Sequence, residues 1–155
     1  GLHRLFYEVN RVLRPGRWFA LATTTPEDAE TPSQRLALEI YQYIRAGFFT
    51  KAEIQAALER MGFQVEQMAF YPTGVNLDPE EAKAFIRFEC DWLERAYGWR
   101  DKPDWQAVWA HFEPRIRALG GLEVDAKVTF FLARKVRPAA PPWADERVLF
   151  QEVRA

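Results

Sequence analysis

The stretch NRVLRPGRWFALATTTP, residues 10–26, joins the end of a helix to an apolar strand through a Pro-Gly bend. Apolar residues recur at helical spacing before the bend, which predicts an amphipathic helix over residues 2–13. Pro15 and Gly16 end that helix. The almost wholly apolar run from Trp18 to Ala22 is typical of a strand covered on both faces, as in a parallel sheet. An α/β fold is therefore expected.

The composition is that of a globular domain. The chain has 155 residues, of which 48% are apolar and 15% aromatic, enough to bury a sizeable core. Its net charge of -1 gives no general attraction to nucleic acid or to an anionic membrane. One cysteine, Cys90, and two histidines, His3 and His111, allow no intrachain disulfide and predict no zinc site. No apolar run reaches the ~20 residues of a membrane span, so we expect a cytoplasmic protein without nucleic-acid or membrane partners.

Capping signals predict four further helices. Their expected ranges are about 32–46, 51–61, 79–97 and 104–119, ended in turn by Gly47, Gly62, Gly98 and Gly120. The second is the best marked, because Thr50 and Glu53 form a capping box before an apolar stripe. Pro114 lies within the fourth and lacks the helical N–H donor, which predicts a kink or a fresh start there.

Two more strands are expected later in the chain. Residues 63–70 follow the best-marked helix, and residues 128–133 form a third apolar run. Residues 138–142 are a stiff Pro/Ala spacer, and residues 148–150 are expected to add a short edge strand or to dock loosely. There is no internal repeat.

Three stretches stand out in chain order: residues 7–21, 48–68 and 127–135. Together they resemble the carboxy-terminal half of the class I S-adenosylmethionine-dependent methyltransferases. YEVNRVLRPGRWFAL, residues 7–21, is similar to the helix and fifth strand after the cofactor pocket, usually E-x-x-R-V-L-[KR]-P-G-G. FFTKAEIQAALERMGFQVEQM, residues 48–68, is similar to the next helix and the sixth strand, with its Gly-Phe turn. KVTFFLARK, residues 127–135, resembles the seventh strand, which the family inserts antiparallel to the rest of the sheet.

These stretches cover about 45 of the 155 residues, in the family's order. One departure is Arg17, where the family usually has a second Gly. A larger one is the absence of the Gly-rich loop after the first strand and of the acidic residue that ends the second. The resemblance thus implies a partial Rossmann-like sheet of about three strands over residues 1–137. Helical insertions are expected at about 24–49 and 71–126, followed by a spacer and tail at 138–155.

The resemblance implies transfer of a methyl group from S-adenosylmethionine to a small, fairly apolar acceptor. Such transfer rests mostly on positioning, so the lack of an obvious catalytic dyad does not count against it. Because the Gly-rich loop is absent, this cofactor is not expected to bind well to residues 1–155 alone. The open flank of the sheet would pair with a missing amino-terminal half or with another chain. A non-catalytic module that dimerises or pairs through this edge is the alternative.

Five residues are candidates for binding the acceptor. Ligands of open α/β sheets lie beyond the carboxyl ends of the strands, where Thr23, Thr24 and Tyr71 are expected. In the family's register His3 would follow the fourth strand's loop, and Phe49 belongs to an aromatic pair in the first insertion. The alternative, which general preferences favour, is that the threonines form a loop that bonds its own backbone and that His3 lies at the surface.

Aromatic residues are concentrated in the two insertions. They either line an apolar substrate cavity or pack the cores of the inserted helices, and helical spacing favours packing for Trp105 and Trp109. The others of this set are Phe48, Phe49, Trp92 and Trp99.

Overall fold

The computed structural model describes residues 1–155 except 45–46, 73, 98–102 and 144–155. The chain forms two compact units, each with a hydrophobic core of its own. Unit 1 comprises Gly1–Thr23, Phe49–Ala69 and the residues from Thr129 onward. Unit 2 comprises Thr24–Phe48 and Phe70–Val128.

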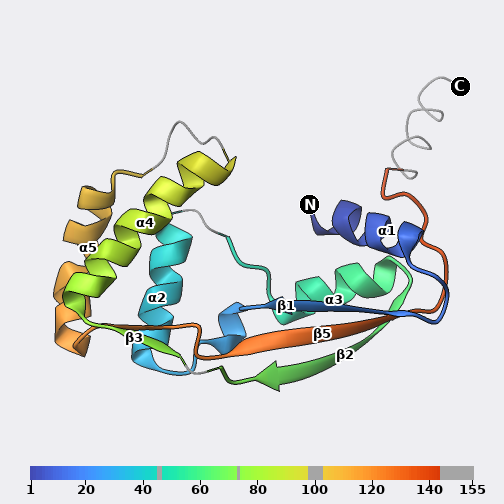
Figure 1. The fold of residues 1–155 in the computed structure, drawn as a ribbon, viewed down its shortest axis with the longest axis horizontal. Coiled ribbons are helices and arrows are strands. Elements are labelled where there is room, and N and C mark those ends of the chain that lie inside the picture. Colours follow the sequence, from blue (N-terminus) through green and yellow to red (C-terminus); the bar gives the residue numbers. More distant parts are fainter. Residues whose placement is uncertain (45–46, 73, 98–102, 144–155) are drawn as a thin grey trace, which may run out of the picture. The chain divides into compact units, whose positions relative to one another are not determined.

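Unit 1 is built on a three-stranded sheet. Its strands are β1 (Trp18–Thr23), β2 (Phe63–Phe70) and β5 (Val128–Lys135), in the order β1-β5-β2. β5 pairs antiparallel with β1. The carbonyl of Gly62 accepts a hydrogen bond from the N–H of Val136 at 3.0 Å, so β2 begins where β5 ends (Figure 1). A mixed α/β fold is confirmed, and its last strand, β5, lies between β1 and β2 in a small antiparallel sheet.

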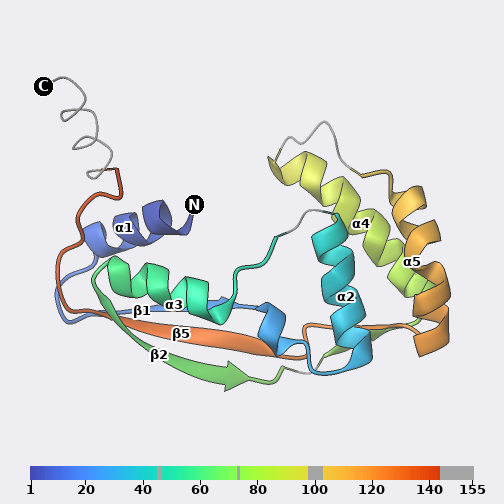
Figure 2. The same ribbon diagram turned by 180° about the vertical axis from the view of Figure 1, so that it is seen from behind.

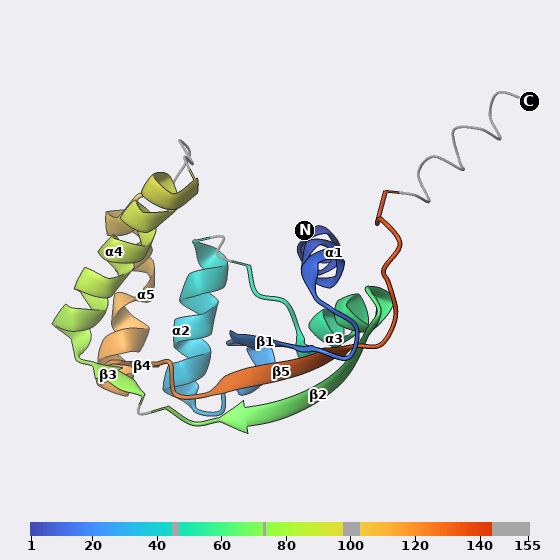
Figure 3. The ribbon, with the colours of Figure 1, turned by 45° about the vertical axis from the view of Figure 1, so that its right-hand side comes forward.

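Helices α1 (Leu2–Val12) and α3 (Lys51–Arg60) pack on the same face of this sheet (Figure 3). α3 begins with the predicted capping box, in which the Thr50 hydroxyl accepts from the N–H of Glu53. Side chains from both helices and the sheet form the core of unit 1: Phe6, Ile54, Ala57, Leu58, Met61, Phe63, Phe131 and Ala133.

The expectation that the first strand is covered on both faces is wrong. Exposed and half-buried residues alternate along β1, and Phe19 and Leu21 point into the core. Trp18, Ala20 and Ala22 lie on the opposite, exposed face. Ala20 and Ala22 are apolar but small, so leaving them exposed costs little buried area. This face of β1 therefore does not require a second layer of helices.

Buried polar contacts fix the end of α1 against the chain that leaves β5. Asn10 is fully buried, and its Nδ2 donates to the carbonyls of Met61 (2.8 Å) and Arg137 (3.0 Å). Lys135 Nζ donates to the carbonyls of Asn10 (2.6 Å) and Leu13 (2.7 Å). The carbonyls at the end of a helix have no hydrogen-bond donor within the helix, and Lys135 supplies one here. This contact links residues 7–21 to β5.

Unit 2 is mainly helical (Figure 2). Its elements are the 3-10 turn η1 (Pro26–Asp28), helices α2 (Pro32–Tyr43), α4 (Pro79–Tyr97) and α5 (Trp105–Leu119), and strands β3 (Val75–Leu77) and β4 (Leu122–Val124). The two short strands pair antiparallel. α5 packs against both α2 and α4, and α2 packs on β4. The core includes Leu36, Ile40, Ile86, Val108, Phe112 and Ile116.

Several boundaries in unit 2 differ from the prediction. η1, β3 and β4 were not predicted, because three-residue elements leave no periodic pattern. α2 ends at Tyr43 rather than near residue 46. α5 runs through Pro114 as one helix, so a fresh start at this proline is wrong. Gly98 and residues 148–150 lie outside the described residues.

In the part of the chain that the structure describes, no helix is long and apolar enough to cross a membrane.

Candidate functional site

A cavity of about 280 Å³ lies within unit 2. It is lined by residues of α2 and α4, by residues 123–127 around the end of β4, and by parts of the segments 24–29 and 47–48. We call it the unit 2 cavity. Its size suits a small organic molecule rather than a single ion.

Three aromatic side chains, those of Tyr41, Phe48 and Trp92, line part of the wall. Tyr41 of α2 meets the ring of Phe48 edge to face, with centroids 5.4 Å apart, and that of Phe85 in the same way at 5.6 Å. Trp92 of α4 also lines the cavity, is 49% exposed, and stacks on Phe88 at 6.3 Å. Part of the wall is therefore apolar and offers the faces of aromatic rings.

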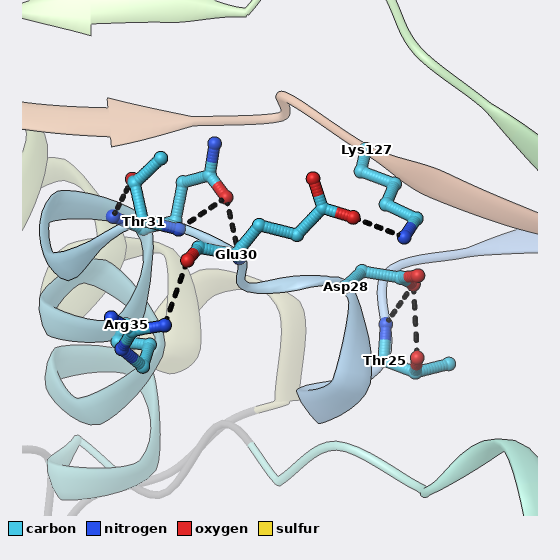
Figure 4. A network of polar contacts seen from close by, with 7 residues as sticks. Thr25, Asp28, Glu30, Thr31, Arg35 and Lys127 are labelled. Carbon is cyan, nitrogen blue, oxygen red and sulfur yellow. Dashed lines mark hydrogen bonds and ion pairs between the residues drawn. The ribbon is translucent and has the colours of Figure 1, made fainter.

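Four carboxylates line the same cavity: Asp28, Glu89, Glu123 and Asp125. Asp28 is buried and accepts hydrogen bonds from the N–H and the hydroxyl of Thr25, both at 2.9 Å (Figure 4). Glu123 accepts from the Thr31 hydroxyl at 3.2 Å, which links β4 to the start of α2. These contacts hold two of the carboxylates in place.

Glu89 and Asp125 form the second pair. Burial and the negative charge of Asp125 raise the pKa of Glu89, while a hydrogen bond from Tyr41 acts in the opposite direction. Burial, followed by the charges of Glu89 and Asp125, raises the pKa of Tyr41 well above its ordinary value. Asp125 has a left-handed backbone (φ 54°) in the turn after β4, a conformation that Asp tolerates better than most residues. The side chains of α2, α4 and this turn thus interact across the cavity.

Lys127 is the cation among the described residues that line the cavity. Its Nζ forms an ion pair with Glu30 at 2.5 Å, and this bond raises the pKa of Lys127 (Figure 4). The same ammonium lies 5.3 Å from the ring centroid of Tyr71. Arg35 donates to the backbone carbonyl of Glu30 at 2.7 Å. The charge of Lys127 is therefore matched by a carboxylate that does not line the cavity.

The structure brings one of the five candidate residues into this cavity. Thr24 lines it, and Tyr71, 62% exposed, adjoins it through Lys127. The other three belong to unit 1: His3 is exposed on α1, Thr23 ends β1, and Phe49 is 47% exposed before α3. Their roles in binding remain predictions.

Some of the aromatic residues line the cavity, and others pack in the core of unit 2. Phe48 and Trp92 line the cavity. Trp109 is 7% exposed in the core of unit 2, and Trp105 packs against that core. Trp99 lies outside the described residues.

The acidic residues of the cavity were not predicted from the sequence. Glu89 and Asp125 are 36 positions apart and come together only through the packing of α4 beside the turn after β4. Tyr41 lies at helical spacing among apolar residues of α2, a pattern that does not reveal its hydroxyl partner. Asp125, just before Ala126 and Lys127, follows a strand too short to be recognised.

No family model and no curated protein matches the chain. Among solved structures, one match is Haemonchus contortus phospholethanolamine N-methyltransferase 2 in complex with phosphomonomethylethanolamine and S-adenosylhomocysteine. The TM-score is 0.40 and the sequence identity 15%. The match covers 87% of this chain but 30% of that chain. At this similarity the match supports no assignment of function.

Proposed function

We propose that this chain is the carboxy-terminal part of an S-adenosylmethionine-dependent methyltransferase acting on a small, fairly apolar acceptor. One observation carries the proposal: residues 7–21, 48–68 and 127–135, which resemble the family, contribute α1, α3 and the three strands of unit 1. β5 lies in the middle of this sheet and antiparallel to β1, as the resemblance implies for the family's last strand. The arrangement supports a partial Rossmann-like sheet.

The residues of this chain do not fit the cofactor by themselves. The resemblance assigns the methionine and ribose of S-adenosylmethionine to a Gly-rich loop and an acidic residue that the sequence lacks. The described glycines with positive φ are Gly16, Gly62, Gly120 and Gly121, and they lie in turns after helices. The proposal therefore assigns cofactor binding to an upstream segment or to a partner chain.

The chain's own part in the reaction is to hold the acceptor. The unit 2 cavity supports this role, because it lies in the inserted residues and carries the apolar side chains Tyr41, Phe48 and Leu93. Methyl transfer depends chiefly on orientation, so a cavity that holds the acceptor in one pose supplies the main contribution.

The test begins with the gene. The coding sequence upstream of Gly1 is expected to specify a strand followed by a Gly-rich loop. Calorimetry should detect S-adenosylmethionine binding to the longer protein and not to residues 1–155 alone. A longer protein that lacks this loop and binds no cofactor would contradict the proposal.

The second candidate, a non-catalytic module that pairs through its sheet, is favoured by the exposed face of unit 1. Trp18 and Met68 are exposed by 52% and 53% on strands at the two edges of the sheet. Sedimentation of residues 1–155 would then give a dimer that Trp18→Ser and Met68→Ser dissociate. A monomer at all concentrations, together with cofactor binding by the longer protein, excludes this candidate.

A further inference from the structure

The charge and the walls of the unit 2 cavity together define the kind of molecule it suits. The walls combine the rings of Tyr41, Phe48 and Trp92 with apolar side chains of α2 and α4. An aromatic surface of this kind binds an apolar frame, and the faces of its rings also attract a positive charge.

The charge of the lining is negative. Four carboxylates line the cavity, and the charge of Lys127 is matched by Glu30, outside the lining. A negatively charged cavity with low-dielectric walls concentrates cations and repels anions. A phosphate or carboxylate ligand is thereby disfavoured.

The carboxylates are spread around the cavity instead of converging on one point. Among the described residues, no group of three His, Cys, Asp or Glu side chains could hold a metal ion. Asp28 and Glu123 are held on the side of η1 and β4, whereas Glu89 comes from α4. Dispersed charges between aromatic rings suit an organic cation better than a metal ion.

We infer that the unit 2 cavity binds a small organic cation, namely an ammonium group carried on an apolar frame. The group lies near Glu89 and Asp125, and the frame packs against Tyr41, Phe48 and Trp92. Binding relieves the repulsion between the two carboxylates, which after burial is the second cause of the raised pKa of Glu89. If the proposed function holds, this amine is the methyl acceptor, and that role alone rests on the proposed function. The ammonium group first gives a proton to a cavity carboxylate. The freed electron pair on nitrogen then forms the N–CH3 bond as the S–CH3 bond of the sulfonium breaks.

The inference can be tested with three probes that share one frame. 2-Phenylethylamine is cationic at neutral pH, 2-phenylethanol is neutral, and 3-phenylpropionate is anionic. Calorimetry on residues 1–155 should show the amine binding at least about tenfold tighter than the alcohol, and no binding of the propionate. Equal affinities for the amine and the alcohol, or no detectable binding of the amine, would overturn the inference.

Variants locate the binding within the cavity. Glu89→Gln keeps an acceptor for the Tyr41 hydroxyl, and Asp125→Asn suits the left-handed backbone, so both should fold. Each should weaken amine binding about threefold to tenfold and leave alcohol binding unchanged. Asp91→Asn, on the same helix as Glu89 but outside the cavity lining, is the matched control and should bind the amine as the parent chain does.

A second pair of variants tests the aromatic wall without changing charge. Trp92→Leu should weaken amine binding about threefold or more. Phe88→Leu alters the neighbouring exposed ring, which does not line the cavity, and should have no effect. Equal effects of the two variants would contradict binding in the cavity.

The binding site and the methyl-acceptor role can be tested separately. If the amine binds but the longer protein transfers no methyl group to it, the binding site stands and only the methyl-acceptor role is rejected.

Discussion

At the scale of single residues, Gly62 is a position where the backbone tolerates little change. Its φ is +84°, and a Cβ there would lie 2.5 Å from the carbonyl oxygen of Arg137. Any L-residue would be strained in this left-handed conformation, and its Cβ would also displace the chain after β5. Since that chain holds Asn10, a substitution at Gly62 disturbs the junction that fixes α1.

Gly62→Ala is therefore expected to lower the free energy of unfolding by about 3 kcal/mol or more, since strain and a backbone clash add. Gly16→Ala is the control, because Gly16 has a similar φ of +75° but no heavy atom within 4 Å of the new Cβ. It should lose only about 1–2 kcal/mol. Urea unfolding of the two variants measures the difference. Equal losses would show that the approach of Arg137 does not matter.

Glu89 is the residue whose charge works against the fold. Its pKa is raised by burial and by Asp125, so the folded chain holds this proton to higher pH than the unfolded chain does. The stability associated with Glu89 is therefore fully present below its unfolded pKa and is lost as pH rises through the folded pKa.

Glu89→Gln removes this loss. Relative to the parent chain, the thermal midpoint of the variant should rise as pH goes from about 4 to about 8. Glu66→Gln, at an exposed position on β2, is the comparison and should show a much smaller change. Thermal melts across this pH range provide the measurement. If the thermal midpoints of Glu89→Gln and the parent chain differ by the same amount at every pH, the pKa of Glu89 is not raised.

At the scale of elements, α5 contains an uncommon feature, since Pro114 lies inside a continuous helix. A proline within a helix lacks the N–H that would bond to the carbonyl of residue 110 and crowds that turn. Its side chain is exposed, so little packing would be lost on removing it. The packing of Phe112 and Ile116 in the core of unit 2 offsets the local cost.

Pro114→Ala should therefore stabilise the protein, by up to about 3 kcal/mol. Pro79 occupies the first position of α4, where its missing N–H would have no helical partner in any case. Pro79→Ala is the matched control and should bring no gain. Chemical unfolding of both variants makes the comparison. No gain from Pro114→Ala would mean that the helix is already adapted to its proline.

Most elements could be predicted because their signals are local. Thr50 with Glu53 and Thr31 with Gln34 form the capping boxes that their spacing predicts, and Gly120 ends α5 in the left-handed conformation. The errors occurred where tertiary packing decides. Core contacts keep α5 intact through Pro114, and helices cover β1 on one face only.

The candidate site was less predictable, for a physical reason. Tyr41, Glu89 and Asp125 come from three separate segments, and no spacing within any one of them indicates a pocket. Glu89 alone resembles an ordinary charged residue on an amphipathic helix. Thr24 was found because it follows a strand, the one general rule that connects topology to ligand position.

At the scale of the whole molecule, the two units have cores that share no residue. Phe131 belongs to the core of unit 1 and Phe112 to that of unit 2, and both are fully buried. Because apolar packing acts over contact distances, removal of either ring should first weaken its own core.

Phe131→Ala should cost about 3–5 kcal/mol and speed amide hydrogen exchange in α1, α3 and the three-stranded sheet. Phe112→Ala should cost a similar amount but act on α2, α4 and α5. Phe88→Ala, at a 60% exposed position, is the control and should change stability by no more than about 0.5 kcal/mol. Exchange followed by mass spectrometry resolves the affected segments. If either core variant speeds exchange equally throughout the chain, the two cores form one cooperative unit, because only coupled unfolding spreads the loss of one ring to helices that do not contact it.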